Sequence, residues 1–255
     1  MERKVVVITG ASGGIGAELA SLLGGSGHRV VLAARRKDAL EAQAAKSGAD
    51  ALAIVCDVMK RADVERLRDE AVRACGRVDV WVNNAGRGIG RKTLELTDAD
   101  VDEMIAVNLK SALYGMQAIV PHFQERGRGH LINVSSMLGR VPMATFRSAY
   151  SASKAALNSL TANLRMDLRA THPDVHVSLV MPGPVATEFH RNALGGTPAP
   201  PPGGMPMQSA AEVARAIADV IARPVAELFT MPGHAEMAAK YFQDVAAFEQ
   251  TMFRR

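Results

Sequence analysis

Tyr150 and Lys154 lie four residues apart in the segment Tyr-Ser-Ala-Ser-Lys. On a helix this spacing brings the phenol and the ammonium group onto one face, about one turn apart. A nearby cation stabilises phenolate and lowers the pKa of a phenol, ordinarily about 10, toward a value useful for proton transfer at neutral pH. In a chain with three tyrosines the spacing is also compatible with coincidence, so other features of the sequence must decide.

A glycine-rich turn near the N-terminus indicates a nucleotide site. The β-branched run Val5–Ile8 predicts a strand buried on both faces of a parallel sheet, and residues 17–23 predict a helix. Between them, Thr9–Gly16 has the pattern T-G-x-x-x-G-x-G. Such a turn lets backbone amides approach a pyrophosphate at the helix N-terminus, where the helix dipole favours negative charge. A tight turn without a ligand is the alternative.

These features belong to a series of motifs through which the chain resembles the short-chain dehydrogenase/reductase family, in its single-domain branch of about 250 residues. The series consists of Thr9-Gly10…Gly14-Ile15-Gly16, Asp57-Val58, Asn83-Asn84-Ala85-Gly86, Asn108, Ser136, Tyr150…Lys154 and Pro182-Gly183…Thr187. Each motif is weak alone, but their order and separations all fit. The resemblance implies an α/β fold with a Rossmann-type, doubly wound parallel sheet of about seven strands flanked by helices, which binds a nicotinamide cofactor.

The resemblance implies a catalytic set made of Asn108, Ser136, Tyr150 and Lys154. Tyr150 would exchange a proton with the substrate oxygen, and Ser136 would hydrogen-bond and orient that oxygen. Ser136 is preferred to Ser135 because it stands three residues before a glycine, as in the family's S-x-x-G pattern. Lys154 would bind the nicotinamide ribose and lower the pKa of Tyr150. Asn108 would bend a long helix and hold a water in the proton relay, and a buried helical asparagine bonded to backbone is the alternative.

The cofactor-binding residues implied by the resemblance are Gly10, Ser12, Gly13, Gly14, Ile15, Gly16, Arg35, Asp57, Val58, Asn84, Tyr150, Lys154, Pro182, Gly183, Val185 and Thr187. The carboxylate of Asp57 would meet the adenine amino group, although capping of the helix predicted over residues 60–75 explains this residue equally well. Asn84 would line the adenosine ribose or brace the sheet. The backbone of Val185 and the hydroxyl of Thr187 would fix the nicotinamide carboxamide.

The choice between NAD(H) and NADP(H) depends on the end of the strand predicted over residues 29–34. An acidic residue there hydrogen-bonds the adenosine ribose and repels a 2′-phosphate. Here the strand ends in Ala34 and continues with Arg35 and Arg36. A guanidinium fork suits a phosphate dianion, so NADP(H) is favoured over NAD(H), with Arg35 as the phosphate ligand. Arg36 is equally compatible with a solvated arginine that begins a helix, and Gly13 stands where many NADP-preferring relatives carry a basic residue.

Length and composition bound the remaining possibilities. The chain has 255 residues, 48% of them hydrophobic, and strands alternate with helices without a separating linker, which predicts one α/β domain over residues 1–255. The 30 basic and 26 acidic residues are interspersed, so nucleic-acid binding is not expected. Two cysteines, no secretory signal and no bilayer-spanning apolar run predict a cytoplasmic protein. The cysteines and histidines lack metal-ligand spacing, so no metal site is expected.

Two segments lie outside these motifs. Residues 188–208 are predicted to form a substrate lid, because residues 195–206 are too rich in glycine and proline for a helix or strand, and a disordered surface insertion is the alternative. Residues 234–255 are predicted to form a helical tail. Its apolar stripe consists of Met237, Tyr241, Val245, Phe248 and Met252. Packing on the chain's own core, a subunit contact and a wall of the substrate pocket all fit this stripe.

The leading function is that of an NADP(H)-dependent oxidoreductase that acts on a carbonyl or secondary alcohol substrate. An NAD(H)-dependent alcohol dehydrogenase and a 3-oxoacyl carrier-protein reductase are alternatives within the family. A non-catalytic NADP(H)-sensing regulator is the alternative from another class. The family usually assembles through two long helices, which the resemblance places at residues 99–124 and 149–170. A homotetramer is therefore expected, with a homodimer as the second choice.

Overall fold

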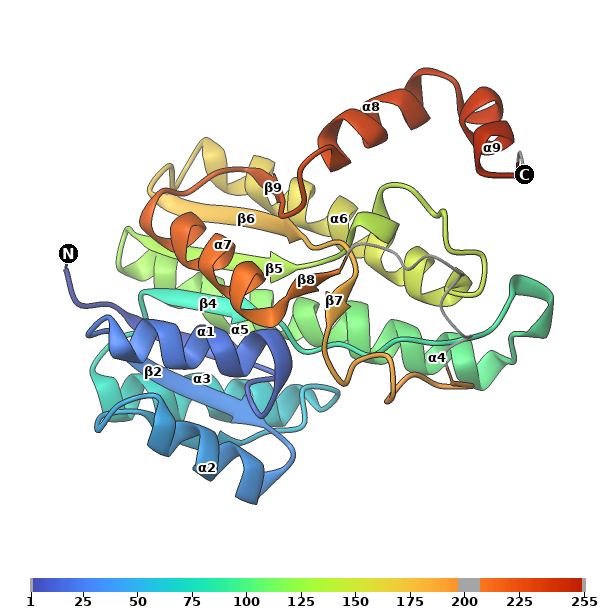
Figure 1. Cartoon of the computed structure of the whole chain (residues 1–255). Helices are drawn as coiled ribbons and strands as arrows, with labels where there is room; N and C mark the ends of the chain where they lie inside the picture. The colour runs from blue at the N-terminus through green and yellow to red at the C-terminus, as the bar shows by residue number, and fades with distance from the viewer. Residues whose placement is uncertain (1, 197–206, 254–255) are drawn as a thin grey trace.

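The computed structural model describes residues 2–196 and 207–253, which fold around a seven-stranded parallel sheet (Figure 1). The strands lie in the order β3-β2-β1-β4-β5-β6-β9. Their bounds are Val5–Thr9 for β1, Arg29–Ala34 for β2, Leu52–Val55 for β3, Val80–Asn83 for β4, Gly129–Val134 for β5, Val175–Met181 for β6 and Glu227–Phe229 for β9. Because β1 pairs with both β2 and β4, the chain winds outward in both directions from the centre. The predicted doubly wound fold is confirmed.

Helices cover both faces of the sheet. In Figure 1, α1 (Gly14–Gly25), α2 (Lys37–Lys46) and α7 (Ala210–Ala222) lie in front of the strands. The opposite face packs against α3 (Arg61–Cys75), α5 (Ser111–Glu125) and α6 (Ser148–Arg169). Successive strand residues alternate between these two cores. Their side chains are apolar on both sides, as expected for a parallel sheet covered by helices on each face.

Adjacent residues of the central strand show this division. Ile8 packs with Leu19 of α1 and Ile217 of α7, whereas Val7 packs with Trp81 and Phe123 on the other face. All six side chains are fully buried. Strand register thus fixes which loop residues emerge on each side of the carboxyl edge of the sheet.

The long helix predicted over residues 99–124 is interrupted in the middle. It consists of α4 (Asp98–Ile105), a π-helical turn (Ala106–Lys110) and α5. Asn108 lies inside the π-helical turn. Such turns widen a helix locally and often occur at functional sites. The second long helix, α6, agrees with the prediction for residues 149–170 within one residue at each end.

The described part of the C-terminal tail is helical, and it forms two helices separated by one residue. Helix α8 spans His234–Gln243 and α9 spans Val245–Phe253. Between them Asp244 has extended backbone angles (φ −154°, ψ 95°), which end the helical path. Figure 1 shows both helices reaching beyond the last strand of the sheet. Among the described residues, no helix combines the length and the apolar character that crossing a membrane requires.

Candidate active site

The glycine-rich turn connects β1 to α1 and is packed too tightly for side chains. A Cβ atom on Gly16 would lie 2.6 Å from the carbonyl oxygen of Gly10 and 2.7 Å from Nδ2 of Asn84. Gly10 has φ +69°, and its Cβ would lie 2.9 Å from Cα of Ala85. The N-cap residue of α1, Gly13, has no side chain to bond the first helical amides. The turn therefore fits a pyrophosphate, because it offers backbone donors at a positively polarised helix end.

Asn84 braces this turn from the neighbouring strand. Its Nδ2 donates to the carbonyl oxygen of Thr9 at 2.9 Å, and its backbone N–H donates to Oγ1 of Thr9 at 3.0 Å. The backbone N–H of Ala85 donates to the same hydroxyl at 3.2 Å. Of the two roles considered for Asn84, the bracing contact is thus present in the structure.

Arg36 is the arginine that reaches the glycine-rich turn. Its Nη2 donates to both the carbonyl oxygen and Oγ of Ser12, each at 3.2 Å. A Cβ on Gly13 would lie 3.3 Å from the same nitrogen. Arg35 is exposed. Strand alternation explains the difference, because Ala34 packs in the core beneath α1 whereas Ala33 packs in the opposite core, so Arg36 follows on the α1 side.

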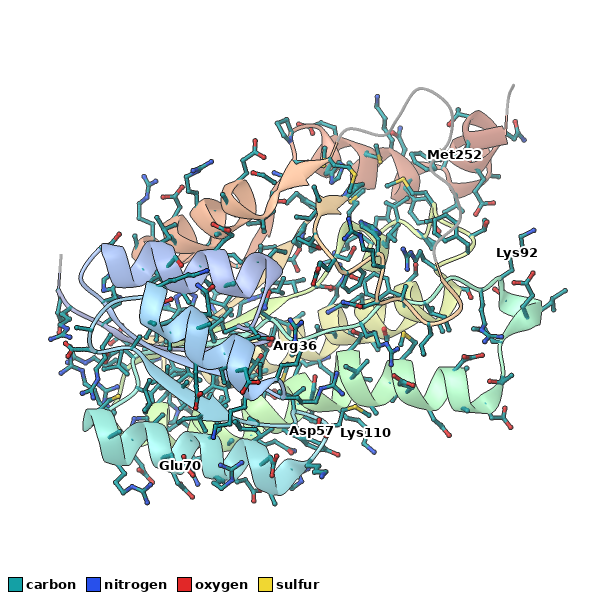
Figure 2. All side chains as sticks on the ribbon, turned by 60° about the horizontal axis from the view of Figure 1, so that its bottom comes forward. Arg36, Asp57, Glu70, Lys92, Lys110 and Met252 are labelled. Carbon is teal, nitrogen blue, oxygen red and sulfur yellow. The ribbon has the colours of Figure 1, made fainter. Side chains whose placement is uncertain are left out.

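Asp57 lies on the loop that follows β3, as Arg36 lies on the loop that follows β2 (Figure 2). Its Oδ1 accepts from the backbone N–H of Met59 at 3.1 Å, and its own N–H donates to Oδ2 of Asp63 at 2.9 Å. The N-cap of α3 is Lys60, so Asp57 closes the preceding turn and does not cap the helix. Val58, beside it, is buried.

Tyr150 lies in the first turn of α6 in a buried environment. Its side chain is 8% exposed, and its ring meets the Phe189 ring at a centroid distance of 5.6 Å. Burial raises the pKa of the phenol above its usual value, while a hydrogen bond with Ser136 and the positive charge of Arg147 oppose this rise. The expectation of a lowered pKa is therefore not met in this structure, because desolvation of the phenolate outweighs the nearby charges.

Lys154 lies one turn after Tyr150, as the spacing predicts. Its Nζ is 5.9 Å from the centroid of the Tyr150 ring and donates to the carbonyl oxygen of Val134 at 2.9 Å. Burial lowers the pKa of the ammonium group to about 8. Arg147 adds a second positive charge near the Tyr150 phenol, which lowers the pKa of that phenol against the effect of burial.

The two serines at the end of β5 have different environments. Oγ of Ser136 accepts from the backbone N–H of Leu138 at 3.1 Å and is the hydroxyl that interacts with Tyr150. Oγ of Ser135 instead donates to Oδ1 of Asn158 at 2.5 Å. Ser136 therefore faces Tyr150, as the S-x-x-G pattern predicts, and Ser135 anchors the strand to α6.

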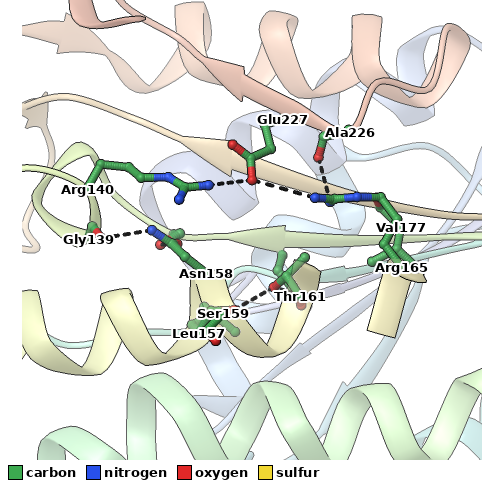
Figure 3. Close-up of polar contacts among 12 residues, drawn as sticks. Gly139, Arg140, Leu157, Asn158, Ser159, Thr161, Arg165, Val177, Ala226 and Glu227 are labelled. Carbon is green, nitrogen blue, oxygen red and sulfur yellow. Dashed lines mark hydrogen bonds and ion pairs between the residues drawn. The ribbon is translucent and has the colours of Figure 1, made fainter. Parts of the chain in front are cut away.

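The loop after Ser136 is held against α6 and β9 (Figure 3). Nδ2 of Asn158 donates to the carbonyl oxygen of Gly139 at 2.9 Å. Glu227 of β9 forms ion pairs with Arg140 of this loop and with Arg165 of α6. These contacts fix the position of the short 3₁₀ turn Met137–Gly139, and with it the hydroxyl of Ser136.

Asn108 and Lys154 both lie next to Gly86. A Cβ on Gly86 would lie 3.0 Å from Oδ1 of Asn108 and 3.6 Å from Nζ of Lys154. The Asn108 amide bonds the backbone of Arg87, accepting from its N–H and donating to its carbonyl oxygen, both at 3.0 Å. The backbone-bonded alternative for Asn108 is thus present in the structure, at the π-helical turn that interrupts the long helix.

The segment that begins at Pro182 closes the other side of the site. Its carbonyl oxygen accepts from the N–H of Met137 at 2.8 Å, and a Cβ on Gly183 would lie 2.3 Å from Sδ of Met231. Cγ2 of Thr187 would lie 3.4 Å from a Cβ on Gly14, which places the threonine beside the glycine-rich turn. Val185 is buried in the strand β7 (Val185–Ala186), which pairs with β8 (Gln208–Ser209).

Comparison with known proteins identifies the family. The family model for short chain dehydrogenases matches residues 4–195. The chain belongs to the short-chain dehydrogenase family. An uncharacterised oxidoreductase of Staphylococcus saprophyticus is 39% identical over 188 residues, which cover 73% of this chain and 76% of the relative. This short-chain dehydrogenase is therefore an oxidoreductase.

Solved structures of the same family agree with the fold of this short-chain dehydrogenase. A short chain dehydrogenase/reductase from Burkholderia phymatum in complex with NAD has a TM-score of 0.86 at 27% identity, covering 96% of this chain and 95% of that one. A short chain dehydrogenase from Burkholderia cenocepacia in complex with NADP has a TM-score of 0.83 at 27% identity, covering 100% of this chain and 99% of that one.

The residues predicted as a substrate lid are described in part. Residues 197–206 lie outside the described chain, and residues 188–196 run beside the loop after β4. The N–H of Leu194 donates to the carbonyl oxygen of Gly88 at 3.0 Å, and the N–H of Gly90 donates to that of Leu194 at 2.7 Å. The described part of this segment is thus hydrogen-bonded to the loop after β4, next to Tyr150.

Proposed function

We propose that this short-chain dehydrogenase is an NADP(H)-dependent oxidoreductase that transfers a hydride between nicotinamide and a carbonyl or secondary alcohol substrate. In this proposal Tyr150 is the general acid and base. The observation that carries it is the buried contact between the Tyr150 phenol and Ser136, with Lys154 one helical turn away. A buried hydroxyl pair beside a cation is an arrangement suited to binding and protonating an oxygen atom.

Each residue of the set has a separate task in this reaction. Ser136 donates a hydrogen bond that orients the substrate oxygen, and Tyr150 donates a proton to it during reduction or accepts one during oxidation. Lys154 binds the ribose hydroxyls and supplies positive charge, and Asn108 holds the bend of the helix behind it. The nicotinamide, when bound, supplies or accepts the hydride.

The chain's own residues fit a dinucleotide along the carboxyl edge of the sheet. Gly10, Ser12, Gly13, Gly14, Ile15 and Gly16 form the pyrophosphate turn in this proposal. Asp57, Val58 and Asn84 surround the adenosine, and Pro182, Gly183, Val185 and Thr187 position the carboxamide. Support comes from the close packing of the turn, which admits no side chain at Gly10 or Gly16, and from Thr187 lying beside Gly14.

A turnover screen tests the function directly. Purified protein is mixed with panels of aldehydes, ketones and secondary alcohols and with either NADPH or NADP⁺, and the absorbance of the reduced nicotinamide is followed. We expect turnover that falls by about 10²–10⁴-fold in Tyr150→Phe, while the Kd for NADPH stays within a few-fold. Activity within a few-fold of wild type would remove Tyr150 from the mechanism. Tight NADPH binding without turnover over the whole panel would favour the cofactor-sensing regulator.

The preference for NADP(H) rests on the arginines after β2. Arg36 has its guanidinium over the glycine-rich turn, and Ala34 ends the strand where an acidic residue would select NAD(H). We expect removal of a charge-assisted phosphate contact in Arg35→Ala or Arg36→Ala to weaken NADPH binding about 10–150-fold and NADH binding only a few-fold. Calorimetric Kd values for both cofactors measure this. Equal losses for NADPH and NADH would contradict the assignment, as would a wild-type preference for NADH.

Assembly and location are further parts of the proposal. We expect a homotetramer, with a homodimer second, through the outer faces of the α4–α5 pair and α6, on which Val101 and Met166 are exposed. Light scattering of the purified protein measures the mass. Both cysteines are free, which fits the reducing cytoplasm. Residues 188–208 are proposed as the substrate lid of a single domain, and residues 234–255 as a tail that packs beside the site.

A further inference from the structure

Arg147 is a buried arginine one helical turn before Tyr150, outside every motif of the family resemblance. Its side chain is 4% exposed, at the N-cap position of α6. Nη1 donates to the carbonyl oxygen of Ile89 at 3.0 Å, and Nη2 lies 3.1 Å from Nδ1 of His190. A buried guanidinium is costly unless its donors are satisfied, so these contacts fix its position.

The guanidinium of Arg147 contacts two segments that are hydrogen-bonded to each other. The loop 88–91 and the segment 189–194 share backbone hydrogen bonds through Leu194. A Cβ on Gly88 would lie 2.6 Å from Nη1 of Arg147 and 2.9 Å from Cε1 of Phe189. The absence of a side chain at Gly88 thus lets the guanidinium and the Phe189 ring lie together. Because the Phe189 ring contacts the Tyr150 ring, Arg147 reaches the phenol through packing as well as through charge.

Arg147 differs in its charge from the other ionisable groups around Tyr150. From α4, Asp100 and Glu103 form ion pairs with Arg91 and Arg87, so each pair is close to neutral. From the segment 189–194, burial and the charge of Arg147 lower the pKa of His190, which keeps the imidazole neutral at neutral pH. From its own helix, Lys154 loses its proton near pH 8. An arginine stays protonated throughout this range.

We propose that Arg147 is a positioning residue for Tyr150, whose guanidinium holds the loop 88–91 and the segment 189–194 beside the phenol and keeps a permanent positive charge next to it. The proposal rests on the proposed function in that Tyr150 is taken as the acid–base group. Lys154 and Arg147 then act on opposite sides of Tyr150 in the sequence, one turn after it and one turn before it. Above about pH 8 the charge of Arg147 becomes the larger of the two.

The test compares variants that separate charge from shape. Arg147→Met and Arg147→Gln remove the charge, and Arg147→Lys keeps it. Arg169→Met is the matched control, because it removes an exposed guanidinium from the last turn of the same helix, far from Tyr150. The first readout is the pH dependence of kcat/KM for oxidation of the best secondary alcohol of the screen with NADP⁺. The second is the titration of isotope-labelled tyrosine by NMR in the NADP⁺ complex, with Tyr150 assigned among three tyrosines through Tyr150→Phe.

Removal of a nearby positive charge makes the phenolate harder to form. We therefore expect Arg147→Met and Arg147→Gln to move both midpoints upward by about one pH unit or more. Arg147→Lys is expected to stay within about 0.3 unit of wild type, and Arg169→Met to be unchanged. Amide exchange of the peptides holding Gly90 and Leu194 should also be faster in Arg147→Met than in the control.

Several results overturn the proposal. One is an Arg147→Met or Arg147→Gln variant whose melting temperature and pH midpoints equal those of wild type. Another is an equal shift in the lysine and neutral variants, which would show that shape alone matters. If one neutral variant does not fold, the other carries the comparison. Wild-type protein without turnover over the whole panel would count against the proposed function, and the NMR titration would then decide the effect of Arg147 on Tyr150 separately.

Discussion

Replacing Lys154 by methionine should stabilise the cofactor-free protein at neutral pH. The ammonium group is 3% exposed, and among the described residues no carboxylate lies within ion-pair distance of it. Burial lowers its pKa from 10.5 to about 8. A buried charge without a counter-charge raises the free energy of the folded state relative to the unfolded chain, whereas a methionine of similar length leaves only apolar atoms in the same space.

The magnitude follows from the pKa and one hydrogen bond. Each pKa unit corresponds to about 1.4 kcal/mol, so a change from 10.5 to about 8 corresponds to about 3 kcal/mol. Methionine also removes the hydrogen bond from Nζ to the carbonyl oxygen of Val134, which contributes about 1 kcal/mol. We therefore expect Lys154→Met to raise the free energy of unfolding by about 2 kcal/mol at pH 7.

The sign of this effect depends on pH. Below pH 8 the folded and the unfolded chains both hold the proton, so the cost of the buried ammonium is present in full. Between about pH 8 and 10.5 the folded chain releases its proton first and the cost disappears. Above this range only the lost hydrogen bond remains, and the variant should become less stable than wild type by about 1 kcal/mol.

Urea unfolding at pH 7 and at pH 10.5 measures both values, with fluorescence of Trp81, the single and fully buried tryptophan, as the probe. Lys110→Met is the control, because Lys110 is exposed and should change stability by less than about 0.5 kcal/mol at both pH values. A Lys154→Met variant that is destabilised equally at both pH values would refute the reasoning, because its loss would then come from packing or hydrogen bonding alone.

Three further predictions concern the glycine-rich turn, acid stability and the tail. Gly16→Ala should lose about 1–3 kcal/mol of stability in a melting assay, because its Cβ would meet the carbonyl oxygen of Gly10. Gly25→Ala, at the open end of the same helix, should be neutral or stabilising in the same assay. Burial lowers the pKa of His130 to about 3, so the unfolded chain takes up a proton below pH 6.5 before the folded chain does. His130→Gln should then lose about 3 kcal/mol less stability than wild type between pH 7 and 4, and parallel pH curves would contradict this. Deleting residues 234–255 should lower the melting temperature or change the oligomer size, because α8 packs on Met137 next to Ser136. A truncated protein with unchanged mass in solution, melting temperature and kinetics would show that the tail is dispensable.

The local part of the fold could be predicted from the sequence because local physics determines it. The run Val5–Ile8 has no polar residue to face solvent, so it had to be a strand covered on both faces. The glycine spacing that follows is required by close backbone contacts that only glycine permits. The order of the outer strands was not predicted, since the pairing of β6 with β9 joins segments whose sequences carry no pairing signal.

The differences between prediction and structure arise from contacts between distant residues. The raised pKa of Tyr150 depends on burial by Phe189 and its neighbours, which the spacing to Lys154 does not reveal. Arg147 stands three residues before Tyr150, but its partners Ile89 and His190 are far away in the sequence. The contact of Arg36 with the glycine-rich turn could have been predicted from the sequence, because strand alternation after Ala34 places Arg36 on the side of that turn.

Helix α6 holds groups that are costly to bury, and its remaining contacts explain how it does so. Tyr150, Lys154 and Arg147 are all buried within its first two turns, where desolvation opposes the charged form of each group. Further along, Oγ1 of Thr161 accepts from Nδ2 of Asn133 at 2.9 Å, and Leu157 and Leu168 pack in the core behind the sheet. A helix anchored by its later turns can hold a desolvated first turn in a fixed position. Stabilising substitutions in the first two turns, such as Lys154→Met, should therefore remove function as they add stability.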